Sequence, residues 1–374
     1  MPLRRFLSFR DFDWALLALL LLLCSVSVVE VHSATLHTKF ASFGSKQIFW
    51  VAAGVAVMFI FAKIDYHRVL DWAPWAYGFG LFSLAAIFTP LGHNALGGRR
   101  WIKAGPIQFQ PSELVKLILL MMVARYFANL GGRNLTWKDI FKAIALVGVP
   151  MLLVMKQPDM GTTLTYAPIL ILGLFLGGIN LRQSLILTAC AAFLIAGVWT
   201  NGFGAGHIRV LKNFQKARLT SFINPQNDPK GAGYQVLQSE IAVGSGGVWG
   251  KGSEKGTQTQ GYFLPIPYTD FIFAALSEEH GFVGAIFVLL LYFLILMRLI
   301  QNAQTAADLP GSLIIMGIVA VLTFQIAVNV GMVIGLMPVT GIPLPLMSYG
   351  GSSVLFTFLA LGVAMNVRMR RFVN

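Results

Sequence analysis

Apolar segments long enough to cross a lipid bilayer recur from one end of this chain to the other. A helix needs roughly 17 to 25 mostly apolar residues to span the hydrocarbon core. Of the 374 residues, 56% are hydrophobic and 11% are charged, and the mean hydropathy is +0.71, which excludes an ordinary soluble domain. The sequence therefore predicts an all-α polytopic membrane protein, a single membrane domain over residues 1–374. Its ten expected spans cover about residues 14–31, 47–62, 74–90, 112–128, 140–155, 160–178, 183–200, 271–298, 312–336 and 350–367.

The N-terminal segment, MPLRRFLSFRDFDWALLALLLLLCSVSVV, combines a basic start with an apolar core, so a cleaved signal peptide is one interpretation. Its core is long, the following VHSA is a poor cleavage site and nine further spans follow, all of which favour a retained first helix. Cys24 and Cys190 are the only cysteines and both lie inside expected spans. The sequence therefore suggests no disulfide, metal cluster or nucleophilic thiol.

Ten spans place both termini on one side of the membrane, and the basic residues indicate which side. With the termini inside, inner segments carry 14 Lys and Arg, against 6 in the short outer loops. This comparison leaves out the basic residues of the connection over residues 201–270, because long loops do not follow the positive-inside rule. It also leaves out Lys116, because that residue lies within a span. The termini are therefore expected in the cytoplasm, with one long extracytoplasmic loop between spans seven and eight. The net charge of +13 fits topology signals and attraction to anionic lipid heads.

The unusual polar residues fall on the outer face. Residues 91–111, LGHNALGGRRWIKAGPIQFQP, carry Arg99, Arg100 and Lys103 around Trp101. One interpretation is an amphipathic stretch in the membrane interface, with Trp101 as an anchor and the cations on lipid phosphates. The other is a dedicated phosphate or pyrophosphate site. The two interpretations overlap if the ligand is a lipid.

The next two charged groups stand near the outer ends of spans. Glu113 and Lys116, in QPSELVKL, are three residues apart, so they share a helix face and can pair. Pairing alone would explain them structurally, but ionisable groups within a membrane usually mark a functional pathway. Asp159, in KQPDMGT, could cap the following helix and still contact a ligand.

The connection over residues 201–270 divides into a basic half and a glycine-rich half. In the first half Arg209, Lys212 and Lys216 recur at helical spacing and would form one cationic face on the membrane surface. In the second half the glycines permit either close approach to a ligand or disorder. A connection of this length inside a compact protein is usually functional. Because GSGGVWGKGS follows no strand of a βαβ unit, nucleotide binding is rejected.

The last outer segment, GLMPVTGIPLPLMSYGGSS, is uncharged, and its prolines exclude a continuous helix. Irregular backbone at membrane depth is tolerated only where protein or a wet cavity covers it. Ser348 and Ser352 offer hydroxyl groups beside small glycines, so they could bind substrate or simply allow close helix packing.

Asp270 precedes the long apolar span eight on this same outer face. It could cap that helix together with Thr269. A carboxylate beside cations at such a boundary is also a candidate general base for a hydroxyl group. Glu278 and Glu279 lie two turns deeper, and at least one of them needs a partner or a proton.

Five stretches of the chain resemble a known family. They are FQPSELVKL, KQPDMGT, GYQVLQSEIAVGSGGVWGKG, TDFIFAALSEEHG and GLMPVTGIPLPLMSYGGSS. In this order, and through nearly the whole chain, they resemble the SEDS (shape, elongation, division and sporulation) proteins, the peptidoglycan glycan-strand polymerases. The short N-terminal tail and FQPSE are closer to the elongation branch, RodA, than to the division branch, FtsW.

The resemblance implies a peptidoglycan glycosyltransferase in the bacterial cytoplasmic (inner) membrane. Such an enzyme polymerises lipid II into β-1,4-linked strands on the extracytoplasmic face and releases undecaprenyl pyrophosphate. By the same resemblance Asp270 is the essential carboxylate, Glu113, Lys116 and Asp159 share its cavity, and a class B penicillin-binding protein is the partner. Family members commonly carry Glu, any residue and His before the Thr-Asp pair. This chain has Ile266, Pro267 and Tyr268 there, so no role transfers to those side chains.

The residues fit this chemistry, in which an acceptor hydroxyl loses a proton as it attacks an anomeric carbon and a pyrophosphate leaves. Asp270 is the expected base, and attack in line inverts the anomeric configuration. The pool of cations for the leaving group is Arg99, Arg100, Lys103, Lys116, Arg209 and Lys212. A divalent cation could share that task, although no ligand cluster demands one, and no metal ligands or nucleic-acid partner are expected.

Two other classes of function remain open. A flippase or transporter of the lipid-linked precursor would also use polar residues inside spans, but the two halves contain no convincing internal repeat. A catalytically silent scaffold for cell-wall enzymes fits less well with a cluster of ionisable groups on the outer face.

Overall fold

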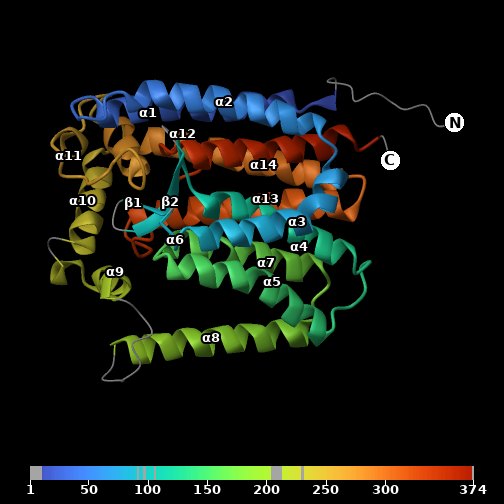
Figure 1. The fold of residues 1–374 in the computed structure, drawn as a ribbon. Coiled ribbons are helices and arrows are strands. Elements are labelled where there is room, and N and C mark those ends of the chain that lie inside the picture. Colours follow the sequence, from blue (N-terminus) through green and yellow to red (C-terminus); the bar gives the residue numbers. More distant parts are fainter. Residues whose placement is uncertain are drawn as a thin grey trace.

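The apolar segments of the chain form long helices that lie side by side in one bundle (Figure 1). The computed structural model describes residues 11–90, 92–95, 98–104, 107–203, 213–228 and 231–372. The helices are α1 Trp14–Thr35, α2 Phe43–Lys63, α3 Tyr66–Ala86, α4 Pro111–Ala128, α5 Trp137–Lys156, α6 Met160–Thr165, α7 Ala167–Leu176, α8 Leu181–Phe203, α9 Asn213–Ile223, α10 Ala232–Ser245, α11 Thr257–Gln260, α12 Ile272–Gln304, α13 Leu309–Val333 and α14 Gly351–Met369.

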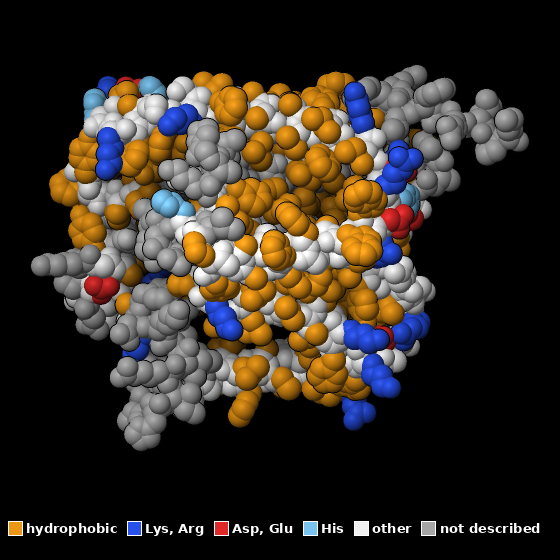
Figure 2. Space-filling view, in the orientation of Figure 1, with side chains coloured by type: hydrophobic (Ala, Val, Ile, Leu, Met, Phe, Trp, Pro, Cys, Tyr) orange, Lys and Arg blue, Asp and Glu red, His pale blue; other side chains and the backbone are white. Residues whose placement is uncertain are grey.

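The length and composition of these helices are those of a polytopic membrane protein. Within the described residues, α1, α2, α12, α13 and α14 are long and apolar enough to cross a bilayer, and residues 160–176 and 181–197 form shorter apolar helices. Large apolar side chains are exposed on the outside of the bundle, as Figure 2 shows for one face, where Lys and Arg stand mainly toward the two ends. Each predicted apolar range overlaps a helix or, for residues 160–178, two helices.

Small residues let the helices approach closely. A Cβ on Gly54 of α2 would lie 2.3 Å from the ring of Phe358 of α14. A Cβ on Gly362 of α14 would lie 2.6 Å from the carbonyl oxygen of Met58. Lipid tails are as apolar as leucine, so helices in a membrane associate through such close packing rather than through the hydrophobic effect.

A buried polar cluster joins the two ends of the chain. Asp13 caps α1, accepting from the Leu16 N–H at 3.2 Å, and its carboxylate also receives Arg298 at 2.8 Å and Arg368 at 3.0 Å. The first and last described residues of the chain therefore lie at the same end of the bundle (Figure 1).

The chain is mostly helical, as predicted, but the all-α prediction did not include a small sheet at residues 92–109. A three-stranded antiparallel sheet forms there from β1 Gly92–Ala95, β2 Gly98–Ala104 and β3 Ile107–Phe109. In β2 the sequence RRWIKA has no helical spacing of apolar residues, whereas strand pairing satisfies its backbone groups across two neighbours. The described part of the cationic segment is thus held as a small sheet.

In its described residues, the connection over residues 201–270 contains helices and is not a plain loop. It contains α9, α10, α11 and a 3-10 turn over Pro225–Asn227. The glycines permit close approach to α12: a Cβ on Gly246 would lie 2.0 Å from the Ser277 carbonyl oxygen. Gly281, with φ 64° and ψ −162°, breaks α12 where Gly250 meets it, since a Cβ on Gly281 would lie 2.3 Å from the Gly250 nitrogen. Helix-to-helix packing thus explains these glycines.

Candidate active site

Asp270 stands in a turn directly before α12, and its backbone is held by a buried amide. Asn329 of α13 is fully buried, and its Nδ2 donates to the carbonyl oxygens of Asp270 at 2.9 Å and Ile342 at 2.8 Å. One side chain therefore joins the Asp270 turn to the proline-rich segment that follows α13. A buried amide with two carbonyl acceptors fixes both segments because each lost bond would leave a buried polar group unsatisfied.

The proline-rich segment holds the same turn from a second side. The Ser348 hydroxyl donates to the Thr269 carbonyl oxygen at 2.6 Å and accepts from the Leu344 N–H at 2.8 Å. The Tyr349 N–H donates to the Tyr268 carbonyl oxygen at 2.9 Å. The prolines that exclude a helix therefore leave a chain whose polar groups bond to the Asp270 turn. Ser348 positions that turn in this structure, and its contact with substrate stays a prediction.

Gly341 keeps the space beside the carboxylate open. Its φ is 72°, in the left-handed region that favours glycine. A Cβ built there would lie 3.3 Å from Asp270 Oδ2 and 3.9 Å from Arg218 Nη1. Asp270 and Arg218 are therefore neighbours across Gly341, although they are 52 positions apart in the sequence.

Arg218 is a functional candidate that the sequence analysis missed. It lies on α9, and its Nη1 donates to the Thr340 carbonyl oxygen at 3.0 Å. Lys216, two residues earlier, is exposed, whereas Arg218 is half-buried. Two residues correspond to about 200° around a helix, so the two cations point to opposite faces. The sequence did contain an indication of this role. Arg218 does not follow the helical spacing of Arg209, Lys212 and Lys216, as expected for a cation that faces the interior.

The electrostatic environment of Asp270 is mixed. Burial is the largest influence and raises the pKa of Asp270 above its usual value, while Arg218, a hydrogen bond from Thr269 and Arg100 pull the pKa back down. The side chain keeps some contact with solvent, although protein atoms surround it densely. A carboxylate with a raised pKa is a stronger base than an exposed one, which suits proton abstraction.

Arg100 and Asp159 complete this group. The Arg100 guanidinium donates to the Pro158 carbonyl oxygen, and its Nη1 lies 3.8 Å from Asp159 Oδ1. Asp159 Oδ1 caps α6 by accepting from the Thr162 N–H at 3.1 Å, and Oδ2 accepts from Gln110 Nε2 at 3.1 Å. The predicted cap is confirmed. The same carboxylate touches β2 and the start of α4, so it also joins three elements.

Glu113 and Lys116 form the expected pair. Lys116 Nζ lies 2.8 Å from Glu113 Oε2, and both residues are buried. They line a cavity between α4, α13 and α14, together with Gln325 and Phe356. Tyr166, whose hydroxyl donates to the Ser112 carbonyl oxygen at 2.8 Å, lies within the electrostatic influence of both Glu113 and Asp159. The pair therefore lies next to the Asp159 group, and a cavity shared with Asp270 stays a prediction.

The remaining predicted residues are placed only in part. Arg99, Trp101 and Lys103 lie on β2 with Arg100; Trp101 is half-buried, and the Arg99 and Lys103 side chains are outside what the structure describes. Ser352 donates to the Gln108 carbonyl oxygen at 3.1 Å and so joins α14 to β3. Arg209 and Lys212 lie outside the described residues.

Comparison with known proteins covers nearly the whole chain. The model of the FtsW, RodA and SpoVE family, described as a cell cycle protein, matches residues 11–372. The chain is 36% identical over 359 residues to the peptidoglycan glycosyltransferase MrdB of Escherichia coli (strain K12), covering 96% of this chain and 94% of that protein.

Two solved structures have a similar fold. One is a chain in a peptidoglycan synthase complex, studied for its coordination of polymerization and crosslinking, with a TM-score of 0.81 and 33% identity over 96% of this chain and 98% of that one. The other is the rod shape determining protein RodA of Thermus thermophilus, with a TM-score of 0.70 and 28% identity over the same shares.

Proposed function

This chain belongs to the FtsW, RodA and SpoVE family, and from that premise we propose that it is a peptidoglycan glycosyltransferase that polymerises lipid II during cell elongation. Its product is a β-1,4-linked glycan strand, and undecaprenyl pyrophosphate is released. The observation that carries the proposal is the group formed by Asp270, Arg218 and Arg100, because it sets a base beside cations that can hold a departing diphosphate.

The protein crosses the bacterial cytoplasmic membrane ten times, with both termini in the cytoplasm and residues 201–270 outside. Support comes from the contact between the two ends of the described chain, where Arg371 Nη2 lies 3.7 Å from Asp11 Oδ1. The basic residues near that end fit the positive-inside rule. In this topology Asp270 is at the extracytoplasmic end of α12, the side on which a flipped lipid-linked sugar is available.

Asp270 takes the proton from the acceptor sugar hydroxyl as the hydroxyl oxygen attacks the anomeric carbon of the second lipid-linked unit. The glycosidic bond forms as the bond to pyrophosphate breaks, so the configuration inverts and one carboxylate suffices. Negative charge develops on the leaving pyrophosphate, where Arg218 and Arg100 stabilise it. Other predicted cations would bind the phosphates of the lipid-linked substrates: Arg99, Lys103, Lys116, Arg209 and Lys212. A bound divalent cation would supply further positive charge for the same task.

A class B penicillin-binding protein is the proposed partner. Strands polymerised at the membrane surface need crosslinking, and the matched chain of the solved synthase complex belongs to an assembly that couples polymerization with crosslinking. The similarity over 98% of that chain supports an equivalent assembly here.

The experiment is a polymerisation assay with purified protein and labelled lipid II in detergent, with and without the partner. Long glycan strands with β-linkages are the expected product. Detergent removes any compartment to transport across, so a pure flippase would leave lipid II unchanged. Absence of polymer under both conditions would overturn the proposal.

A further inference from the structure

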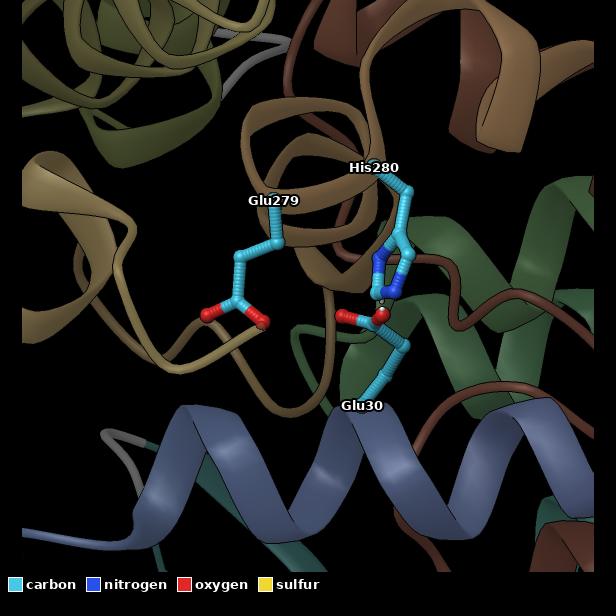
Figure 3. Close-up of side chains that lie close together, drawn as sticks. All are labelled: Glu30, Glu279 and His280. Atoms are coloured by element: carbon cyan, nitrogen blue, oxygen red, sulfur yellow. Dashed lines mark ion pairs between the residues drawn. The ribbon is translucent and has the colours of Figure 1, made fainter. Parts of the chain in front are cut away.

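A second cluster of ionisable groups lies where α12 breaks, away from Asp270. Glu279 and His280 precede Gly281 on α12 and face Glu30 of α1, and Figure 3 shows the three side chains converging on the space between the two helices. One ligand atom from each of the three residues lies within 4.8 Å of the others. Seven residues of α-helical rise, about 10 Å along the axis, separate Glu279 from Ile272, where α12 begins just after Asp270. The cluster is therefore distinct from the candidate active site.

Glu30 is a buried carboxylate that lacks the donors it needs. It is 0% exposed, and Glu279 is 1% exposed. Glu30 Oε1 lies 2.8 Å from His280 Nδ1, but Oε2 has no hydrogen-bond partner among the described residues. A buried ionised carboxylate is costly unless it is paired and hydrogen-bonded. An unpaired oxygen aimed into a cluster of potential ligands therefore points to a missing positive group.

The charges of the cluster do not balance. Among the described residues, the hydrogen-bond donors to Glu279 are neutral: the Ser33 hydroxyl at 2.6 Å, the Glu254 N–H at 3.1 Å and Gln260 Nε2 at 3.4 Å. Its sequence neighbour Glu278 is different, since Lys251 Nζ lies 2.7 Å from Glu278 Oε1. Two buried carboxylates thus share at most one imidazolium ion, and a net negative charge remains in a site shielded from water.

One member of the cluster, His280, is partly exposed at the surface of the bundle. The His280 side chain is 39% exposed. Together with Glu30 it lines an apolar groove between α1 and α12 that also includes Val29 and Gly284. His280 therefore lies at the edge of the cluster, on the surface of the bundle.

We propose that Glu30, Glu279 and His280 bind one divalent transition-metal ion that joins α1 to α12 at its break. Two carboxylates and one imidazole suit Zn²⁺ or Mn²⁺ better than Ca²⁺ or Mg²⁺, which prefer oxygen ligands alone. Ligand atoms about 2.1 Å from a tetrahedral ion lie roughly 3.4 Å apart. This spacing falls between the 2.8 Å of the Glu30–His280 pair and the 4.8 Å limit of the cluster, so small side-chain rotations suffice. The two positive charges of the ion balance the negative charges of the Glu30 and Glu279 carboxylates, and His280 binds as a neutral imidazole. It fixes the half of α12 that leads to Asp270.

The test is metal binding by full-length protein in detergent after treatment with EDTA. We expect titration with ZnCl₂ or MnCl₂ to give one tightly bound ion per chain, with Zn²⁺ tighter than Mn²⁺, as the usual order of affinities requires. Glu30→Gln and His280→Gln should each weaken this site at least tenfold. EDTA should lower the unfolding temperature of the wild type but not that of Glu30→Gln.

Two controls separate this site from others. Glu240→Gln changes an exposed carboxylate on α10, and Asp270→Asn changes the carboxylate of the candidate active site. Both variants should still bind the ion. His280 is partly exposed, so His280→Gln gives a readout even if Glu30→Gln fails to fold. A wild type that binds no ion stoichiometrically would overturn the inference and indicate a protonated Glu30. Equal binding by wild type and His280→Gln would also overturn it. Either result leaves the glycosyltransferase assay unaffected.

Discussion

Arg218 and Lys216 are two cations on one short helix with opposite expected roles. Arg218 stands beside Asp270, and Lys216 is exposed. Since a donor aimed at developing charge is worth about 10²-fold to 10³-fold in rate, Arg218→Gln should lower kcat for lipid II polymerisation by roughly that amount. Lys216→Gln should change it little. Equal rates for the two variants would remove Arg218 from the mechanism.

The pH dependence of polymerisation follows from the same neighbours. Burial raises the pKa of Asp270, and the base must be deprotonated to work, so the acidic limb of the rate profile should lie above the ordinary Asp value of about 3.9. Arg218 lowers this pKa, so Arg218→Gln should raise it and shift the acidic limb to higher pH. The profile of kcat/KM against pH measures both. A shift to lower pH in the variant would contradict the assignment.

At the scale of elements, the turn at Gly341 is expected to matter for activity more than for folding. Gly341→Ala strains the backbone by roughly 1–2 kcal/mol and brings a Cβ to 3.3 Å from Asp270 Oδ2. Gly131, with φ 64°, has open space around it, so Gly131→Ala carries the strain without the contact. Both variants should lose similar stability in thermal unfolding, and only Gly341→Ala should lose polymerase activity. Equal activities would show that the space beside the carboxylate is not needed.

The close packing of α2 on α14 gives a stability prediction. Gly54→Ala places a Cβ 2.3 Å from the Phe358 ring, and such overpacking typically costs about 1–3 kcal/mol. Gly78 of α3 has open space, so Gly78→Ala should be neutral or slightly stabilising. Thermal unfolding in detergent compares the two. If Gly54→Ala were as stable as Gly78→Ala, the interface would be looser than this packing implies.

At the scale of the whole molecule, hydropathy was enough to locate the apolar helices, because a bilayer requires continuous apolar segments of known length. The motifs were enough to identify the family. The sheet at residues 92–109 was missed, since its strands are short and their polar residues also suit an amphipathic stretch in the membrane interface. The glycine-rich half of the 201–270 connection was ambiguous because glycine permits close packing, ligand approach and disorder equally.

Site residues could be predicted only where a charged side chain stood at a distinctive position in the sequence, such as the end of an apolar segment. Asp270, Asp159 and the Glu113–Lys116 pair stood out as carboxylates or ion pairs at helix ends. Asn329 and Gly341 did not, because an amide or a glycine in an apolar segment gives no sign of which distant carbonyl or carboxylate it will meet. Such neighbours depend on how α9, α13 and the proline-rich segment pack together, which no local pattern specifies.

The central claim, that Asp270 is the base of a glycan polymerase, is tested most directly by lipid II turnover of purified Asp270→Asn beside wild type and Glu240→Gln. We expect the Asn variant to insert and to unfold at a temperature near that of the wild type, yet to lose at least about 10²-fold in rate, as removal of a general base requires. Glu240→Gln should polymerise normally. Full activity in Asp270→Asn would contradict the account.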